Sequence, residues 1–109
     1  MSFPTIDLLT DPGDAKATVK AVVFYIASER ARGTRLLKVL HPDDKNTQVL
    51  LARKLRKLRA GGRIVCFSQA GAVKEEEAQA LYIADKVPQV TEDGDFFTPA
   101  STVTYILLA

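Results

Sequence analysis

Residues 14–41 read DAKATVKAVVFYIASERARGTRLLKVLH, and this stretch carries most of the fold prediction. Val19, Val22 and Ile26 recur at three- and four-residue spacing with no Gly or Pro between them, which predicts an amphipathic helix over 15–32. Gly33 is typical of the residue that follows a helix end. The apolar run 35–41 predicts a strand, because β-branched and large apolar residues favour strands and the following proline ends it. The stretch is therefore a helix–strand unit.

The rest of the chain continues this alternation of strand and helix. Leu51, Leu55 and Leu58 form one apolar stripe of a second helix, capped by Asn46 or Thr47 and ended by Gly61-Gly62. A third helix is expected over 73–86, with Glu75–Glu77 in its first turn, where carboxylates complement the helix dipole. Further strands are predicted over 5–9, 63–69 and 101–108, and a short extra strand near 96–97. The order β-α-β-α-β-α-β indicates one α/β domain over residues 1–109.

Composition excludes several classes of protein. The chain of 109 residues has no apolar run long enough to span a membrane and no secretory signal at its start, so we expect a cytoplasmic protein without membrane contact. A single cysteine forms no internal disulfide, which fits a reducing compartment. No Cys/His cluster, phosphate-binding loop or nucleophile elbow occurs, and we expect no resident cofactor.

Charge is distributed unevenly along the chain. Residues 30–63 contain eleven Lys and Arg against two acids, whereas residues 64–109 contain two Lys against seven acids. Such asymmetry predicts a basic surface that attracts the backbone of DNA or RNA. The alternative reading is that amphipathic helices simply keep their cations in water. The residues predicted to bind nucleic acid are Arg53, Lys54, Arg56, Lys57, Arg59 and Arg63, with no aromatic residue among the first five to stack on bases.

The single histidine, His41, is the other candidate. It ends a predicted parallel strand, and the carboxyl ends of parallel strands meet at the edge of the sheet where ligands bind. Asp7 in the first strand should face that edge, and Asp43 and Asp44 follow His41 directly. An imidazole beside carboxylates can transfer a proton near neutral pH. The competing interpretation is a histidine at the end of a strand, followed by the turn-forming sequence Pro-Asp-Asp.

Three stretches together resemble the Smr (small MutS-related) domain family: IDLLTDPGDAKATVKAVVFYIASERARGTRLLKVLHPDD (6–44), LARKLRKL (51–58) and TVTYILL (102–108). The resemblance implies a two-layer β-α-β-α-β-β core with helices on a mixed four-stranded sheet, like the C-terminal domain of translation initiation factor three. Residues 70–95 would then be a helical insertion. The family binds nucleic acid, and some members cleave it. Its Leu-Asp-x-His motif is represented by 6–9 and its His-Gly-x-Gly motif by 41–44.

Both motifs are altered in this chain. Asp7 and His41 match the family, but Leu9 stands in place of a histidine, and Pro42 and Asp44 replace the two glycines. The resemblance therefore implies non-sequence-specific nucleic-acid binding with weak or lost nuclease activity. Residual hydrolysis would use His41 as general acid or base, Asp7 to orient it, and Asp43 or Asp44 to hold a divalent cation.

An alternative from another class is a protein-interaction module that associates with itself. The basic part of one chain would face the acidic part of another through a two-fold contact, with Phe96, Phe97 and Tyr82 as exposed apolar groups.

Overall fold

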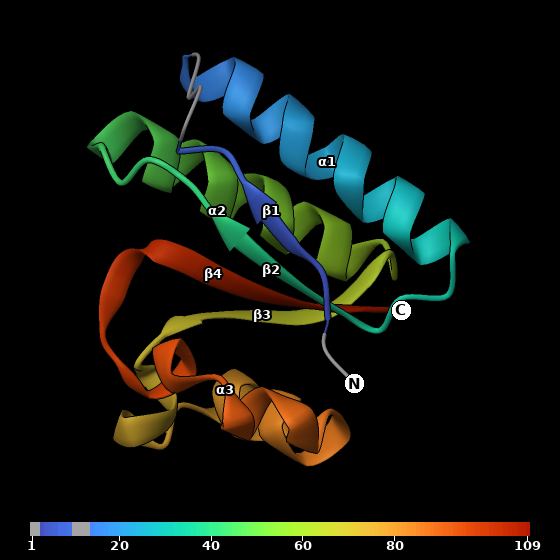
Figure 1. The fold of residues 1–109 in the computed structure, drawn as a ribbon. Helices are drawn as coiled ribbons and strands as arrows, with labels where there is room; N and C mark the ends of the chain where they lie inside the picture. The colour runs from blue at the N-terminus through green and yellow to red at the C-terminus, as the bar shows by residue number, and fades with distance from the viewer. Residues whose placement is uncertain (1–2, 10–13) are drawn as a thin grey trace.

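A computed structural model of the chain describes residues 3–9 and 14–109. It confirms the alternating order predicted from the sequence (Figure 1). The elements are β1 (Thr5–Asp7), α1 (Ala15–Ala31), β2 (Leu36–Leu40), α2 (Lys45–Ala60), β3 (Ile64–Ala70), α3 (Ala78–Lys86) and β4 (Ala100–Leu108), with three short 3₁₀ helices, η1 (Ala72–Glu75), η2 (Pro88–Glu92) and η3 (Gly94–Phe97).

The four strands form one mixed sheet in the order β1-β2-β4-β3. β1 runs parallel to β2, with Thr5 opposite Lys38 and Asp7 opposite Leu40, and α1 makes the connection between them. β4 lies between β2 and β3 and is antiparallel to both. The mixed four-stranded sheet predicted from the sequence is confirmed.

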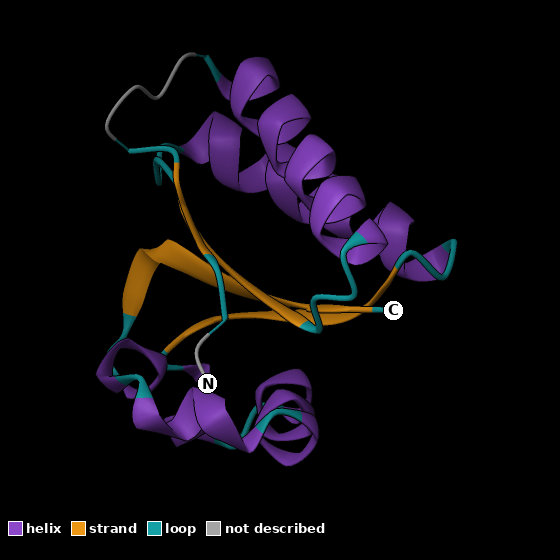
Figure 2. Cartoon of the chain, turned by 45° about the vertical axis from the view of Figure 1, so that its right-hand side comes forward, coloured by secondary structure: helices purple, strands orange, loops and turns teal. Residues whose placement is uncertain are grey.

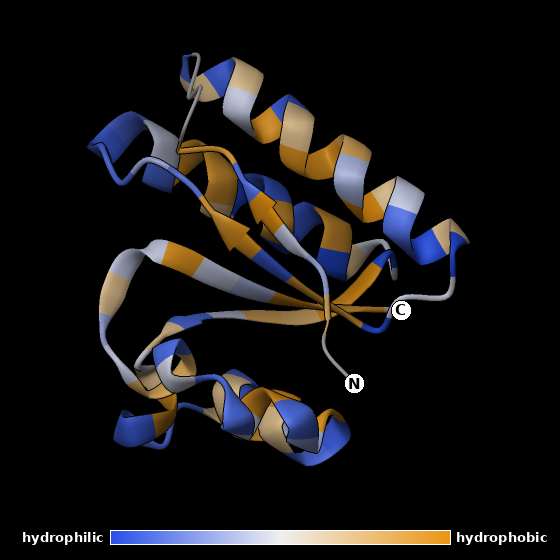
Figure 3. Ribbon diagram, in the orientation of Figure 1, coloured by the Kyte–Doolittle hydropathy of each residue, from blue (hydrophilic) through white to orange (hydrophobic). Residues whose placement is uncertain are grey.

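Helices cover both faces of the sheet, so the fold has three layers where the sequence predicted two. α1 and α2 lie side by side on one face, and α3 with the 3₁₀ helices lies on the other (Figures 1 and 2). Side chains alternate along β4, so that Ile106 packs toward α1 and α2 whereas Tyr105 and Leu107 pack toward α3. Apolar residues concentrate on the strands and on the helix surfaces that face them (Figure 3).

The helix ends follow the capping chemistry of the sequence, with one correction. Gly33 has φ +83°, and Thr34 N donates to Glu29 O at 3.0 Å, so the helix ends as predicted. α2 is capped by Asp44 and not by Asn46 or Thr47. Asp44 accepts from Thr47 N at 3.1 Å and from Thr47 Oγ1 at 2.7 Å, and its extended backbone places the helix start at Lys45.

The segment between β3 and β4 differs most from its prediction. The continuous helix expected over 73–86 is broken, because Glu76 has φ +55° and separates η1 from α3. Only Glu77 serves α3, as the N-cap that accepts from Ala80 N at 3.0 Å. The expected strand at 96–97 is part of η3. Phe96 is fully buried, with its ring centroid 5.2 Å from that of Tyr105, so its predicted exposure is wrong.

Among residues 3–9 and 14–109, no helix combines the length and apolar character that crossing a bilayer requires. The expectation that residues 70–95 are an insertion into the Smr pattern stays a prediction.

Candidate nucleic-acid interface

α2 presents a buried side and a cationic side, as its sequence predicts. Leu51, Leu55 and Leu58 are buried against the sheet. Because a helix turns 100° per residue, Arg53 and Lys57 project away from this stripe, and both are exposed. α2 begins and ends with capped turns, so these cations stand on a rigid element.

A groove of ≈ 290 Å³ lies between α1 and α2, and we call it the α1–α2 groove. Its apolar floor includes Val19 and Leu50, and its rim carries cations from both helices. The lining cations are Lys16, Lys20, Arg53, Lys54 and Lys57. The sequence analysis missed Lys16 and Lys20. Their four-residue spacing places them on one face of α1, but the register of the two helices had to be known before they joined the α2 cations.

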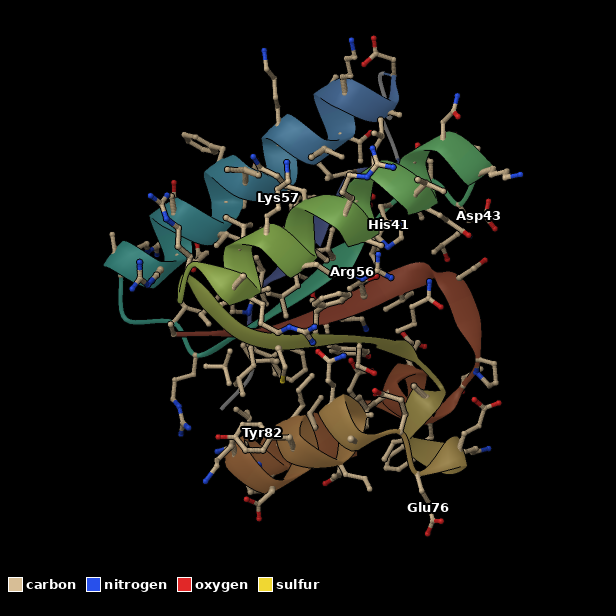
Figure 4. The ribbon with its side chains drawn as sticks, turned by 180° about the vertical axis from the view of Figure 1, so that it is seen from behind. His41, Asp43, Arg56, Lys57, Glu76 and Tyr82 are labelled. Atoms are coloured by element: carbon tan, nitrogen blue, oxygen red, sulfur yellow. The ribbon has the colours of Figure 1, made fainter. Side chains whose placement is uncertain are left out.

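The sheet separates the charges of the molecule into two layers. The sequence that forms the α1–α2 layer (14–35 and 43–63) holds twelve Lys and Arg against four acids, a net charge of +8. The sequence of the α3 layer (71–99) holds two Lys against seven acids, a net charge of −5. Figure 4 shows Arg56 and Lys57 on one side of the sheet and Glu76 and Tyr82 on the other. An anionic ligand therefore meets opposite fields on the two sides.

Lys38 does not belong to the basic surface, although the sequence analysis counted it there. It lies in β2 at 9% exposure, and its side chain enters the α3 layer. Its Nζ is 2.8 Å from a carboxylate oxygen of Asp93 and 2.8 Å from one of Asp95. Burial alone would lower the pKa of the Lys38 ammonium, but the hydrogen bonds and charges of the two carboxylates outweigh it and raise that pKa. Lys38 is therefore a paired structural cation.

The remaining predicted cations occupy other parts of the layer. Arg59 Nη1 donates to Gln79 Oε1 at 2.7 Å, and its guanidinium lies 5.7 Å from the ring centroid of Phe67, which directs it toward β3. Arg63 lines a separate hollow with Arg30 near the C-terminal ends of α1 and α2. Of the six predicted residues, three thus meet in the α1–α2 groove, and Arg56 is exposed beside them on α2.

His41 follows β2 and is buried, with 1% exposure. Its Nδ1 is 2.9 Å from the carbonyl oxygen of Pro42, and its Nε2 is 2.7 Å from Thr104 Oγ1. Because a carbonyl only accepts, Nδ1 carries the proton, and in the neutral ring Nε2 accepts from the Thr104 hydroxyl. Both nitrogens are thus engaged within the protein, which gives the imidazole a structural role.

The three carboxylates near His41 have other partners. Asp7 Oδ1 accepts from Leu9 N at 2.8 Å, and Asp43 Oδ2 accepts from Ser101 Oγ at 2.7 Å. Hydrogen bonds from the Thr47 side chain and backbone hold the pKa of the Asp44 carboxyl below its ordinary value.

Within the described residues, no carboxylate forms a hydrogen bond with the imidazole, and no group of three His, Cys, Asp or Glu is placed to hold a metal ion. A catalytic role for His41 and these acids stays a prediction.

A second hollow, the His41 cleft, lies on the opposite flank of α2. It has a volume of ≈ 270 Å³ and is lined by residues of α2, β3 and the start of the α3 layer, together with His41 and Thr104. Its lining also includes Gln48, Leu51, Ala52, Leu55, Phe67, Ser68, Gln69, Ala72, Glu77 and Gln79. The sequence analysis missed this cleft, because the uncharged side chains of Gln48, Gln69 and Gln79 are too far apart in the sequence to form a motif.

No model of a known protein family matches this chain, and no curated protein shows significant sequence similarity to it.

Proposed function

We propose that the chain is an Smr-like domain that binds the phosphate backbone of DNA or RNA without sequence specificity, and in which nuclease activity is weak or lost. One observation carries the proposal: cations from two helices surround a single groove, while the layer on the opposite side of the sheet has a net charge of −5. If the cations of α2 only kept an amphipathic helix in contact with water, Lys16 and Lys20 of α1 would have no reason to line the same groove.

The groove is suited to backbone contact. Five cations can each neutralise a phosphate, so for duplex DNA the logarithm of the binding constant should fall with the logarithm of salt with a slope of about −4 to −5. Val19 and Leu50 offer an apolar floor for sugar atoms. None of the described residues that line the groove is aromatic, which favours phosphate contact over base stacking there.

Two observations support weak or lost cleavage. His41 is buried and has both ring nitrogens engaged, whereas a general acid or base must reach the proton it transfers. Leu9, which stands where the Leu-Asp-x-His motif of the resembled family has its histidine, is 41% exposed and has no titratable group.

The test compares a triple variant of the groove with a double variant of the opposite layer. Arg53→Gln, Lys54→Gln and Lys57→Gln together remove three groove cations, and Lys74→Gln with Lys86→Gln removes cations from the opposite layer. Affinity for a short duplex is measured by fluorescence anisotropy across a salt series. The triple variant should lower the steepness of the salt dependence by about 3, because each phosphate contact contributes about 0.9, and the control should leave it unchanged. Salt-independent binding, or an equal loss in the control, would refute the proposal.

Self-association remains the second candidate, favoured by the same separation of charge. Since the basic and acidic layers lie on opposite sides of the sheet, the basic layer of one copy meets the acidic layer of another head to tail, and two-fold closure cannot satisfy both contacts at once. Leu81 and Tyr82 on α3 are 46% and 44% exposed and would lie in this contact. Sedimentation velocity at low salt should show assembly that grows with concentration. A monomer at every concentration removes this candidate.

A further inference from the structure

The His41 cleft combines apolar walls with polar groups in a way that the α1–α2 groove does not. Leu51 and Leu55 from α2 and Phe67 from β3 supply the apolar surface. Gln48 on α2 and Gln69 on β3 also line the cleft, and within the described part of the chain their side-chain amides form no hydrogen bond. Glu77 uses one carboxylate oxygen to cap α3 and leaves the other available.

Two arginines of α2 are neighbours of residues that line the cleft. Ala52 lies in the lining, and Arg56 follows it by one helical turn, so the two side chains are neighbours on α2. Arg59 is held near the cleft by Gln79, which lines it, and by the ring of Phe67. An anionic group attached to a ligand in the cleft would therefore meet Arg56 and Arg59 at the surface.

We propose that the His41 cleft binds one adenine base of a nucleotide, with its phosphate at Arg56 and Arg59. A volume of ≈ 270 Å³ is close to the lower end of the range for ligand sites, about 300–1,000 Å³, and accommodates one planar base without a second. A glutamine amide pairs in bidentate fashion with N6 and N7 of adenine, and a carboxylate oxygen accepts from an exocyclic amine. Gln48, Gln69 and Glu77 supply these groups, and the leucines and Phe67 cover the faces of the ring.

The base has two sources of the same chemistry: a free mononucleotide, or an unpaired adenosine in a bound strand. The second source rests on the proposed function. The α1–α2 groove and the cleft occupy opposite flanks of α2, with Arg53 in the lining of the groove and the exposed Arg56 between the two sites. A backbone bound in the groove can therefore cross α2 and place an unpaired base in the cleft, as proteins that recognise single-stranded loops and bulges do.

The test uses adenosine 5′-monophosphate, ribose 5-phosphate, a perfect duplex and the same duplex with one bulged adenosine. Ala52→Phe fills the cleft, and Ala60→Phe makes the same substitution at an exposed α2 position outside it. NMR titration of the wild type should shift the side-chain amides of Gln48 and Gln69 with the nucleotide and not with ribose phosphate. Ala52→Phe should weaken nucleotide binding at least tenfold, and Ala60→Phe should not. Gln69→Ala, at an exposed side chain, provides a second variant if Ala52→Phe does not fold.

The duplex arms separate the two sources and the two proposals. A bulged duplex that binds more tightly than the perfect one, with the advantage lost in Ala52→Phe, supports recognition within a strand. Nucleotide binding without any bulge advantage supports the mononucleotide source. Equal binding of the nucleotide and ribose phosphate, or nucleotide binding unchanged in Ala52→Phe and Gln69→Ala, overturns the cleft proposal. If the cleft proposal fails but the perfect duplex still binds, the proposed function is unaffected. If the nucleotide binds but the perfect duplex does not, only the proposed function is refuted.

Discussion

Lys38→Met tests whether the two ion pairs of one lysine attach the acidic layer to the sheet. Lys38 reaches from β2 to Asp93 and Asp95, which flank the start of η3. The hydroxyl of Tyr105 on β4 donates a hydrogen bond to the Asp93 carboxylate at 2.9 Å, so residues of two strands hold the same carboxylate. Methionine retains the length and apolar stem of lysine and removes only its charge. The substitution therefore leaves Asp93 without its counterion in a largely buried position.

The magnitude follows from the exposure of the two carboxylates. Removing one partner of a buried ion pair costs about 3–5 kcal/mol. The Asp93 side chain keeps 20% exposure and also hydrogen bonds from Tyr105 and the backbone N–H of Asp95, so we expect about 2–3 kcal/mol for Lys38→Met. Asp95 is 60% exposed, and Asp95→Asn should cost about 0.5 kcal/mol. Adding Asp93→Asn to Lys38→Met removes the orphan charge and should restore about 1 kcal/mol.

Urea unfolding followed by far-UV circular dichroism measures these differences, and its pH dependence tests their origin. Burial would raise the pKa of the Asp93 carboxyl, but hydrogen bonds from Lys38 and Tyr105 outweigh burial and lower it. A lowered folded-state pKa gives stability that is present above the unfolded value of about 3.9 and is lost as pH falls through the folded value. The deficit of Lys38→Met should therefore be constant near neutral pH and shrink below about pH 4.

Two results would refute this reasoning. A deficit for Lys38→Met below about 0.5 kcal/mol would show that the pair contributes no more than a surface salt bridge. If Asp95→Asn lowered the free energy of unfolding as much as Lys38→Met does, burial would not determine how much each carboxylate contributes to stability.

Two further substitutions test the packing around the candidate site. His41→Ala should lower the free energy of unfolding by about 2–4 kcal/mol, because it leaves a cavity and deprives the Thr104 hydroxyl of its partner; calorimetry that finds unchanged stability would contradict this role. Gly71→Ala should lower the urea midpoint of unfolding more than Gly33→Ala does. Both glycines have φ above +80°, but only at position 71 would a Cβ clash with Pro99, at 2.5 Å from the Pro99 Cα. Equal urea midpoints for the two variants would show that the clash is relieved.

Local patterns were sufficient to predict the fold order. The stripe Leu51, Leu55 and Leu58 and the stop at Gly33 are decided within one or two helical turns, and the structure confirms both. The prediction of the α2 N-cap was wrong because several neighbouring residues are suitable caps. Asn46 and Thr47 are good caps, but Asp44 takes the position because the Thr47 hydroxyl and backbone N–H both donate to it. Each of these outcomes lies within a few residues of its cause.

The candidate site could be predicted only in part, because its groups come from distant segments. Lys38 looked like a solvent-exposed cation, and its pairing with Asp93 spans 55 positions in the sequence. Phe96 looked exposed because it follows the polar run 91–95, yet its ring packs on Tyr105 of β4. Lys16 and Lys20 joined the cations of the α1–α2 groove only once α1 lay beside α2. No periodicity within an element encodes these contacts.

The paired Lys38 connects the stability of the molecule to its electrostatics. The α3 layer carries seven acids, and if it detached from the sheet these charges would be free to approach the cations of the α1–α2 groove. Lys38 pairs two of them from within β2, and Phe96 anchors the same segment in the core beneath α3. The sheet then stands between the two sets of charges, and the groove cations face solvent and not an internal acidic segment. A basic surface on so nearly neutral a chain, with a net charge of +2, depends on that separation, so we expect substitutions of the residues that hold η2 and η3 in place to weaken the proposed nucleic-acid binding without removing a groove cation.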